Sequence, residues 1–399
     1  MPAAASLARA GLALALLVLL AAAAAGCDHE DAAETAASPP PTRTLQSLGP
    51  GEGRLNLVTW AGYVEDGSND PAVDWVTPFE RRTGCRVTVR VADTPDDVVA
   101  LLRTGAYDGA SATGDVTGRL LAIGRLAPVD TGLLRNYRNV YDALKRLPSN
   151  VARGRVYGVP QGRAANLLMW RTDVVRPAPT SWSMVFDARS PYRGKVTAYD
   201  NPIAIADAAV YLKTARPELG IEDVYELDDR QFRAALALLR RQREIISNYW
   251  SDFVREQAAF VAGDAVLGTT WQLVAGLLRA DRVPVATTLP REGATGWSDS
   301  WLISSRARHP NCMYRWIDWM LSPRINAQVA EWFGEAPANR KACAFTADRR
   351  HCATYHAADE RYYAKVAFWK TPRRDCGDAR GEVCKPYEDW VDAWEEITD

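Results

Sequence analysis

The chain has 399 residues, of which 48 are basic and 49 acidic, and its formal net charge is −1. This length allows two domains with sizeable cores, while the nearly balanced charge excludes a broad basic surface for nucleic acid. Tryptophan is abundant, at 14 residues, and rings beyond the needs of packing often line ligand sites or interfaces.

Residues 1–27 have the layout of a secretory signal. Arg9 precedes a continuous apolar run over residues 12–25, which is too short for a comfortable membrane span. The small residues before Cys27 resemble a bacterial lipobox, although Ala24 stands where a leucine is usual. We therefore predict an exported protein, in the periplasm or on the outer face of the cell membrane, anchored through a lipid on Cys27. Ordinary signal cleavage nearby remains the alternative.

Residues 28–53 are expected to form a flexible tether. They are rich in Ala, Pro, Ser, Thr and Gly, include three consecutive prolines at 39–41, and show no apolar periodicity. Such a segment would hold a folded body away from a membrane surface.

The remaining cysteines are expected to form disulfides. Removing Cys27 from the seven cysteines leaves six, and an even number in an exported chain favours disulfides over metal binding or redox work, as does the absence of a C-x-x-C motif. Six cysteines allow many pairings, so the connectivity stays open. Nearness in sequence favours Cys343 with Cys352 and Cys376 with Cys384, leaving Cys85 with Cys312.

The first folded part alternates strands and helices, which predicts a βαβ layer around a parallel sheet. In chain order we expect a strand at 54–60, a helix at 72–83, a strand at 85–91, a helix at 96–103, a turn at 105–108 leading into a small strand, and a helix at 115–123.

A second unit begins after residues 157–162, and its patterns are again mixed. In chain order we expect a strand at 166–170, a turn or short helix at 182–186, a strand at 195–199, helices at 205–214, 232–246 and 252–262, a buried strand at 265–271, and helices at 310–321, 323–333 and 387–397.

Aromatic and acidic residues gather where predicted strands end. Trp60, Asp200, Trp271 and Trp297 lie at strand ends or just after them, where open α/β sheets place their ligand crevices. Trp297 and Asp299 are two apart in extended chain and so share a face. A ring face beside a carboxylate suits an organic cation. The alternative is that these residues serve only as core packing and turns.

Several short stretches, in a characteristic order and spacing, resemble the spermidine/putrescine-binding proteins that serve ABC transporters. The resemblance spans residues 55–339. The stretches are LVTWAGYV at 57–64, GAYD at 105–108, YGVP at 157–160, TSW at 180–182, YRGK at 192–195, GDAVLG at 263–268 with Trp271, PREG at 290–293 and WSDS at 297–300.

The resemblance implies an α/β, two-lobed periplasmic-binding-protein-like fold of type II, in which crossover strands join the lobes and a ligand cleft lies between them. One lobe would comprise residues 54–163 and 297–341. The other would comprise residues 164–296 and 342–399, including a cysteine-bearing tail outside the usual family pattern.

The resemblance also implies a set of ligand contacts. Aromatic rings would enclose an alkyl chain and its ammonium ends, Asp299 would pair with an amine near the centre of the site, and Asp200 would pair with another amine. The predicted ligand-binding residues are Trp60, Tyr63, Thr113, Asp115, Asp200, Trp271, Trp297, Asp299 and Glu335.

Three positions depart from the family pattern. Ile203 stands where an acidic residue is frequent, Asp115 lies where a tyrosine and a small hydroxyl residue are usual, with Thr113 keeping a hydroxyl, and Glu335 replaces an aromatic residue. The spacing of amines in the ligand is therefore expected to differ from that of spermidine.

The expected function is capture of a polyamine and its delivery to an ABC permease by a monomer that has no catalytic residue, cofactor or metal. The alternatives are another cargo, such as a cationic amino acid, thiamine or iron, and a sensor role. Iron would require clustered tyrosines and carboxylates, and the pair at 362–363 lies in the tail. A secreted hydrolase is disfavoured because hydrolase motifs are missing and the histidines lie away from the predicted cleft, at His29, His309, His351 and His356.

Overall fold

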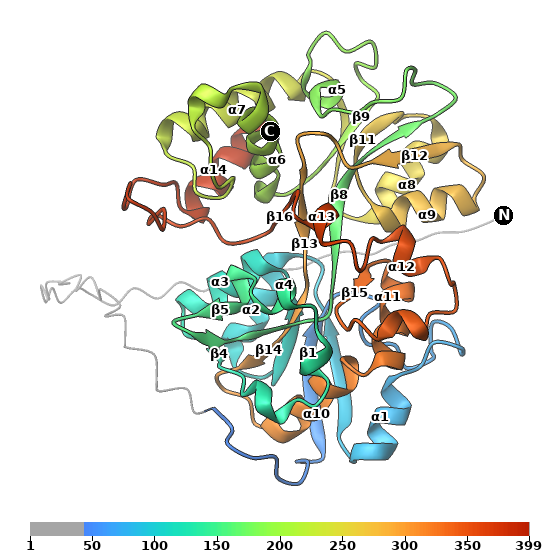
Figure 1. Cartoon of the computed structure of the whole chain (residues 1–399), viewed down its shortest axis with the longest axis vertical. Helices are drawn as coiled ribbons and strands as arrows, with labels where there is room; N and C mark the ends of the chain where they lie inside the picture. The colour runs from blue at the N-terminus through green and yellow to red at the C-terminus, as the bar shows by residue number, and fades with distance from the viewer. Residues whose placement is uncertain (1–43, 399) are drawn as a thin grey trace, which may run out of the picture. The chain divides into compact units, whose positions relative to one another are not determined.

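Two mixed sheets with helices beside them make up most of the computed structural model, which describes residues 44–398 (Figure 1). The predicted signal segment, Cys27 and the first part of the predicted tether lie outside these residues. Within residues 44–398, no helix is long and apolar enough to cross a membrane.

The first sheet has six strands in the order β2-β1-β3-β14-β4, with β7 also paired to β14. The strands β1, β2 and β3 are parallel, as their alternation with helices predicts, and β14 runs antiparallel to β3. The strands are β1 Arg54–Thr59, β2 Arg86–Val91, β3 Gly109–Ala112, β4 Leu126–Ala127, β7 Gly158–Pro160 and β14 Ser300–Ser304.

Helices of this part follow directly from local signals. Thr94 and Asp97 form a reciprocal capping box at the start of α2, and Gly105 ends that helix with φ 73°. Along β1, Leu57 and Val58 enter different buried clusters because successive side chains point to opposite faces. The longer helices here are α1 Val76–Thr83, α2 Pro95–Thr104, α3 Gly114–Ala122, α10 Pro310–Met320 and α11 Pro323–Phe333.

The second sheet has eight strands in the order β10-β9-β11-β8-β13-β16, with β12 and β15 also paired to β8. Its strands are β8 Gly162–Arg171, β9 Val196–Tyr199, β10 Ile246–Trp250, β11 Leu267–Trp271, β12 Val285–Thr288, β13 Ala294–Trp297, β15 Ala336–Pro337 and β16 Val366–Phe368. Its helices are α5 Ser183–Phe186, α6 Ile205–Ala215, α7 Asp229–Arg243, α8 Phe253–Ala262, α9 Gln272–Ala280 and α14 Tyr387–Thr398.

Short elements complete the described chain. The hairpin of β5 and β6 forms a separate two-stranded sheet. These elements are α4 Asp142–Lys145, β5 Val151–Ala152, β6 Arg155–Val156, α12 His351–Thr354 and α13 Glu360–Tyr363.

The chain passes between the two sheets at neighbouring points. β7 of the first sheet ends at Pro160 and β8 of the second begins at Gly162, while β13 of the second ends at Trp297 and β14 of the first begins at Ser300. The backbone N–H of Gln161 donates to the Asp299 carbonyl at 2.7 Å. The two passages are therefore fastened to each other.

Some elements differ from the sequence predictions. The helix predicted from residue 72 begins only at Val76, because Asp74 accepts a hydrogen bond from the Thr77 N–H and the chain before it forms turns. The helix predicted at 232–246 ends at Arg243, and β10 follows. β10 pairs with β9 in parallel, a long-range contact that its mixed composition does not reveal.

Three disulfides are present among the described residues. They confirm the pairings that nearness in sequence favoured: Cys85 with Cys312, Cys343 with Cys352, and Cys376 with Cys384.

The described end of the predicted tether, residues 44–53, is packed on α10. The Gly49 N–H donates to Asn311 at 2.7 Å, and the Glu52 carboxylate accepts from the N–H groups of Asn311 and Cys312 at 2.9 Å each. Glu52 thereby satisfies free N–H groups in the first turn of α10. This part of the segment is fixed to the folded chain.

Candidate ligand-binding site

The segment between β13 and β14 places Asp299 where the chain changes sheets. The Ser298 hydroxyl donates to the Gly162 carbonyl at 2.7 Å, beside the Gln161 to Asp299 backbone bond. Asp299 is 2% exposed. A carboxyl group is thus held inside the protein at the junction of both sheets.

Glu335 and Tyr63 lie against this junction. The Tyr63 hydroxyl donates to Oε2 of Glu335 at 3.0 Å, and both side chains are fully buried. A Cβ atom on Gly162 would lie 2.1 Å from Cδ of Glu335. Only glycine at position 162 leaves room for the Glu335 carboxyl group.

Burial raises the pKa of three carboxyl groups in the candidate site. It raises the pKa of Asp299 to about 7, a rise that the nearby Tyr63 hydroxyl opposes and the charge of Asp115 reinforces. Burial, followed by the charge of Asp299, raises the pKa of Glu335 well above its usual range. Burial also raises the pKa of Asp115. These groups influence one another and resist carrying negative charge together.

Each of these carboxyl groups keeps an oxygen without a partner. Oδ1 of Asp115, Oδ1 of Asp299 and Oε1 of Glu335 are buried and accept no hydrogen bond within the described chain. The indole N–H groups of Trp60 and Trp297 are likewise buried and unpaired there. Buried polar atoms are normally hydrogen-bonded, so the three carboxyl oxygens point to a ligand that donates hydrogen bonds.

An aromatic wall lies beside the carboxyl groups. Tyr63 stacks on Phe333 with ring centroids 4.0 Å apart, and Trp297 meets Phe333 edge-on at 5.6 Å. Trp297 is buried and Trp60 half-buried. Phe333, the last residue of α11, joins two of the predicted aromatic contacts.

A second aromatic group forms at the ends of β9, β10 and β11. Trp271 lies 5.5 Å from Tyr199 and 4.9 Å from Trp250, and Trp369 stacks on Tyr199 at 5.8 Å. The pKa of Tyr199 is raised by burial and then by the charges of Asp115, Asp200 and Asp299. Tyr199 is therefore within electrostatic reach of predicted carboxylates from both sheets.

Asp200 occupies a more open position than the other acidic candidates. It is exposed, and its Oδ1 accepts a hydrogen bond from the Trp394 indole of α14 at 2.9 Å. Ile203 is buried in the core beside the second sheet. Among the predicted contact residues, the acidic groups with buried, unpaired oxygens are Asp115 on α3, Asp299 in the segment between β13 and β14, and Glu335 between α11 and β15.

A family model described as "Bacterial extracellular solute-binding protein" matches residues 74–349. The chain belongs to this family. Among curated relatives, the solute-binding protein is 26% identical over 310 residues to a putrescine/cadaverine-binding protein of Pseudomonas aeruginosa, covering 73% of this chain and 81% of that protein. It is 24% identical over 284 residues to the spermidine/putrescine-binding periplasmic protein of Escherichia coli, covering 70% and 76%.

A solved structure shares the fold of the solute-binding protein. The TpPotD lipoprotein of Treponema pallidum superposes with a TM-score of 0.69 at 17% identity, covering 86% of this chain and 99% of that one. The predicted α/β periplasmic-binding-protein-like fold is confirmed.

Most of the predicted ligand-contact residues lie in two groups. Tyr63, Asp299 and Glu335 touch or adjoin one another, Trp297 joins them through Phe333, and Asp115 acts on Asp299 through its charge. Trp271 belongs to the second aromatic group, and Asp200 directly follows Tyr199 of that group in the sequence. Thr113 occupies the N-cap position of α3 without a capping hydrogen bond from its side chain, and it is buried. The role of each in ligand binding stays a prediction.

Four aromatic residues of these two groups were not predicted from the sequence. Tyr199 directly precedes Asp200, Phe333 ends a predicted helix two residues before Glu335, and Trp250 ends an unpredicted strand. Trp369 lies in the tail, where its backbone N–H donates to the Gly296 carbonyl next to Trp297. Only the first two stood close enough to a predicted contact for the sequence to have indicated them.

Across residues 44–398, no group of three or more His, Cys, Asp and Glu side chains is arranged to hold a metal ion. Tyr363 of the pair at 362–363 donates its hydroxyl to the Tyr355 carbonyl at 2.8 Å.

Proposed function

We propose that this solute-binding protein captures a linear di- or polyamine outside the cytoplasm and delivers it to the permease of an ABC importer. The curated relatives named for putrescine, cadaverine and spermidine support this assignment. The site provides binding groups and no proposed catalytic residue.

The observation that carries the proposal is the set of buried carboxyl oxygens without partners at Asp115, Asp299 and Glu335. An ammonium group entering this site loses hydration worth several kcal/mol, which only paired carboxylates can offset. The ring faces of Trp297 and its neighbours add about 0.5 to 2 kcal/mol each and provide apolar walls for the methylene spacers.

The acidic groups also bear on which amine binds. Asp115 and Glu335 add carboxyl groups near Asp299, whereas Ile203 offers none and Asp200 is exposed with one oxygen engaged by Trp394. We infer a ligand with its strongest positive charge at the Asp299 end and an alkyl segment toward Trp271.

Calorimetric titration of the purified protein with putrescine, cadaverine, spermidine, spermine and agmatine tests the proposal. We expect at least one amine to bind with micromolar or tighter affinity, which corresponds to about 8 kcal/mol. Asp299→Asn should weaken that binding by about 2 to 5 kcal/mol, because a buried cation loses its charged partner. Heat from none of the amines would refute the proposal. The same titrations with arginine, lysine and thiamine would redirect it to another cargo if one of these bound instead.

A matched control separates binding from folding. Asp207 is also a buried carboxyl group whose pKa is raised by burial to about 7, and it accepts a hydrogen bond from Thr295 beneath the second sheet. Asp207→Asn should leave amine affinity unchanged. Equal loss in both variants would mean that the Asp299 effect is structural.

The anchor and the lobe boundaries belong to the same proposal. We propose that Cys27 carries a lipid, that the mature protein acts as a monomer, and that residues 54–163 with 297–341 move against residues 164–296 with 342–399. One solved structure of this fold is itself of a lipoprotein. Cys27→Ala should release the protein from the membrane fraction of cells that express it, and continued membrane association would contradict the anchor.

A further inference from the structure

The chain after β16 leaves the second sheet and runs onto a helix of the first. β16 pairs with β13, and the Trp369 N–H extends this pairing by donating to the Gly296 carbonyl at 2.8 Å. Lys370 then forms ion pairs with Asp223, at 2.6 Å, and with Glu226. The start of segment 369–371 is therefore fixed to the second sheet and its loops.

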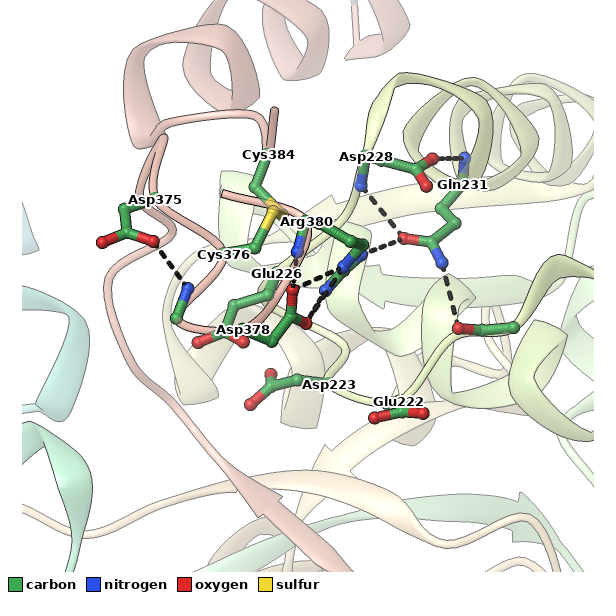
Figure 2. A network of polar contacts seen from close by, with 12 residues as sticks. Glu222, Asp223, Glu226, Asp228, Gln231, Asp375, Cys376, Asp378, Arg380 and Cys384 are labelled. Atoms are coloured by element: carbon green, nitrogen blue, oxygen red, sulfur yellow. Dashed lines mark hydrogen bonds and ion pairs between the residues drawn. A yellow bond between two sulfur atoms is a disulfide. The ribbon is translucent and has the colours of Figure 1, made fainter. Parts of the chain in front are cut away.

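A disulfide loop fixes the chain after this segment to the same part of the molecule (Figure 2). Cys376 and Cys384 close the loop, and Arg380 inside it pairs with Asp378 at 2.7 Å and donates to Gln231 of α7 at 3.1 Å. The next residue, Lys385, donates its N–H to the Leu227 carbonyl at 2.9 Å. Segment 369–371 is thus held at both ends.

Between these fixed ends the segment lies against α3. The Thr371 hydroxyl donates to the Asp115 carbonyl in the first turn of α3. A Cβ atom on Gly114 would lie 2.1 Å from the Trp369 carbonyl oxygen, and one on Gly118 would lie 2.2 Å from the Thr371 hydroxyl oxygen. The two glycines allow a close approach that no larger residue would permit.

A further contact extends the same face of α3. The Arg119 guanidinium lies 4.6 Å from the ring centroid of Tyr387, the first residue of α14. Position 119 is one residue beyond Gly118, and 118 is one helical turn beyond 114. One face of α3, which also carries Asp115, therefore meets the tail along its length.

We propose that residues 369–371 form a strap, held by the second sheet, that docks on α3 and keeps the two sheets closed around the ligand. The proposal rests on the proposed function, because it assumes that ligand is captured between the two parts. Thr371 is then a positioning residue, since it fixes the turn of α3 from which Asp115 faces the site. Contacts made only in the closed state raise the population of that state and slow ligand release.

Gly118→Ala tests the strap without changing any residue assigned to the ligand. The new methyl group would collide with Thr371, the only residue within 4 Å among its nearest neighbours, so it should oppose docking. We expect putrescine to dissociate about tenfold faster or more, with a matching loss of affinity.

Two further variants separate docking from helix stability. Gly276→Ala on α9 places the same change in a helix where a Cβ meets nothing within 4 Å, and it should bind putrescine as the wild type does. Thr371→Val removes the hydroxyl that donates to the Asp115 carbonyl with little change in volume, so it should also speed putrescine release, though less than Gly118→Ala. Unchanged release in Thr371→Val would overturn the strap.

A second readout needs no ligand. Nitroxide labels on Val91→Cys of β2 and Val254→Cys of α8, both exposed positions, report the separation of the two parts by pulsed electron paramagnetic resonance. Gly118→Ala should lower the population with the shorter distance, and Thr371→Val should lower it to a smaller extent. An unchanged distance distribution would overturn the strap.

The two proposals fail in different ways. If the wild type binds putrescine and Gly118→Ala binds it with the same rate and affinity, the strap is wrong and the polyamine function stands. If the wild type binds no amine, the proposed function is wrong, and the label distances alone decide the strap.

Discussion

Asp299 combines burial with an incompletely satisfied carboxyl group. It is 2% exposed, and its Oδ1 accepts no hydrogen bond in the described chain. Its pKa, raised by burial to about 7, means that the unliganded protein holds this group protonated over much of the acidic range. A bound ammonium would favour the charged form. Under the proposed function, ligand and proton therefore compete for the same group.

This competition predicts a pH dependence of affinity. Below a pH of about 7, binding must release a proton from Asp299, so the dissociation constant should rise as pH falls, approaching tenfold per unit for one linked group. Titrations of putrescine from pH 8 to pH 5 in buffers of different ionisation heat measure both the affinity and the released protons. Affinity that stays constant across this range would contradict the role of Asp299.

The same pKa predicts an opposite trend for stability without ligand. Because the folded pKa exceeds the unfolded one, the native state binds more protons between about pH 4 and pH 7, and stability falls as pH rises through that window. Asp299→Asn should remove a share of this loss, on the order of 1 to 3 kcal/mol by urea unfolding at pH 5 and pH 8. Asp207→Asn should show a similar stability effect with unchanged amine binding, and identical slopes in all three proteins would contradict the prediction.

At the scale of single residues, contacts between sequence neighbours could be predicted, and contacts between residues far apart in the sequence could not. The pair Trp297 and Asp299 was predicted from its two-residue spacing after a turn, which is local information. Trp250 and Trp369 could not be placed in the same way, because they reach Trp271 and Tyr199 only through tertiary packing. Glu335 was identified as a departure from the family pattern. Its hydrogen bond to Tyr63 could not be predicted, because the two residues are 272 positions apart.

Elements with strong local signals were predicted closely, and short paired strands were not. The helix predicted at 323–333 matches α11, which has proline in its first turn and Gly334 at its end. β12 and β16 have four and three residues, and they exist because β8 and β13 provide partners. Pairing of this kind depends on the assembled sheet rather than on local propensity.

The disulfides allow a quantitative test at this scale. Cys85 and Cys312 are 227 positions apart, and Cys376 and Cys384 are 8 apart. Loop entropy in the unfolded chain predicts that removing the first pair by double Ala substitution costs about 5 kcal/mol, and removing the second about 2 kcal/mol. Urea unfolding of both variants checks the order, and a larger loss for the short loop would indicate that its contacts with Gln231 and Leu227 dominate.

At the scale of the whole molecule, the candidate site lies where the chain passes between sheets. The passages at 160–162 and 297–300 are joined by the Gln161 to Asp299 bond, and the tail adds a contact with α3 at Asp115. A ligand held at this place stabilises the folded state in proportion to the logarithm of its concentration, by about 2.7 kcal/mol at a hundredfold excess over the dissociation constant.

This stabilisation should appear as a higher melting temperature with a bound amine. The wild type should show the rise with putrescine or another binding amine, and Asp299→Asn should show little or none at the same concentration. Differential scanning calorimetry measures both. An equal rise in the two proteins would place the ligand away from Asp299.

A crystal structure of the protein grown with the tightest-binding amine tests the central claim most directly. We expect an ammonium nitrogen about 3 Å from Oδ1 of Asp299, with the alkyl chain against the ring of Trp297. Amine density elsewhere in the molecule, or Asp299 bonded only to protein groups in the complex, would contradict the account.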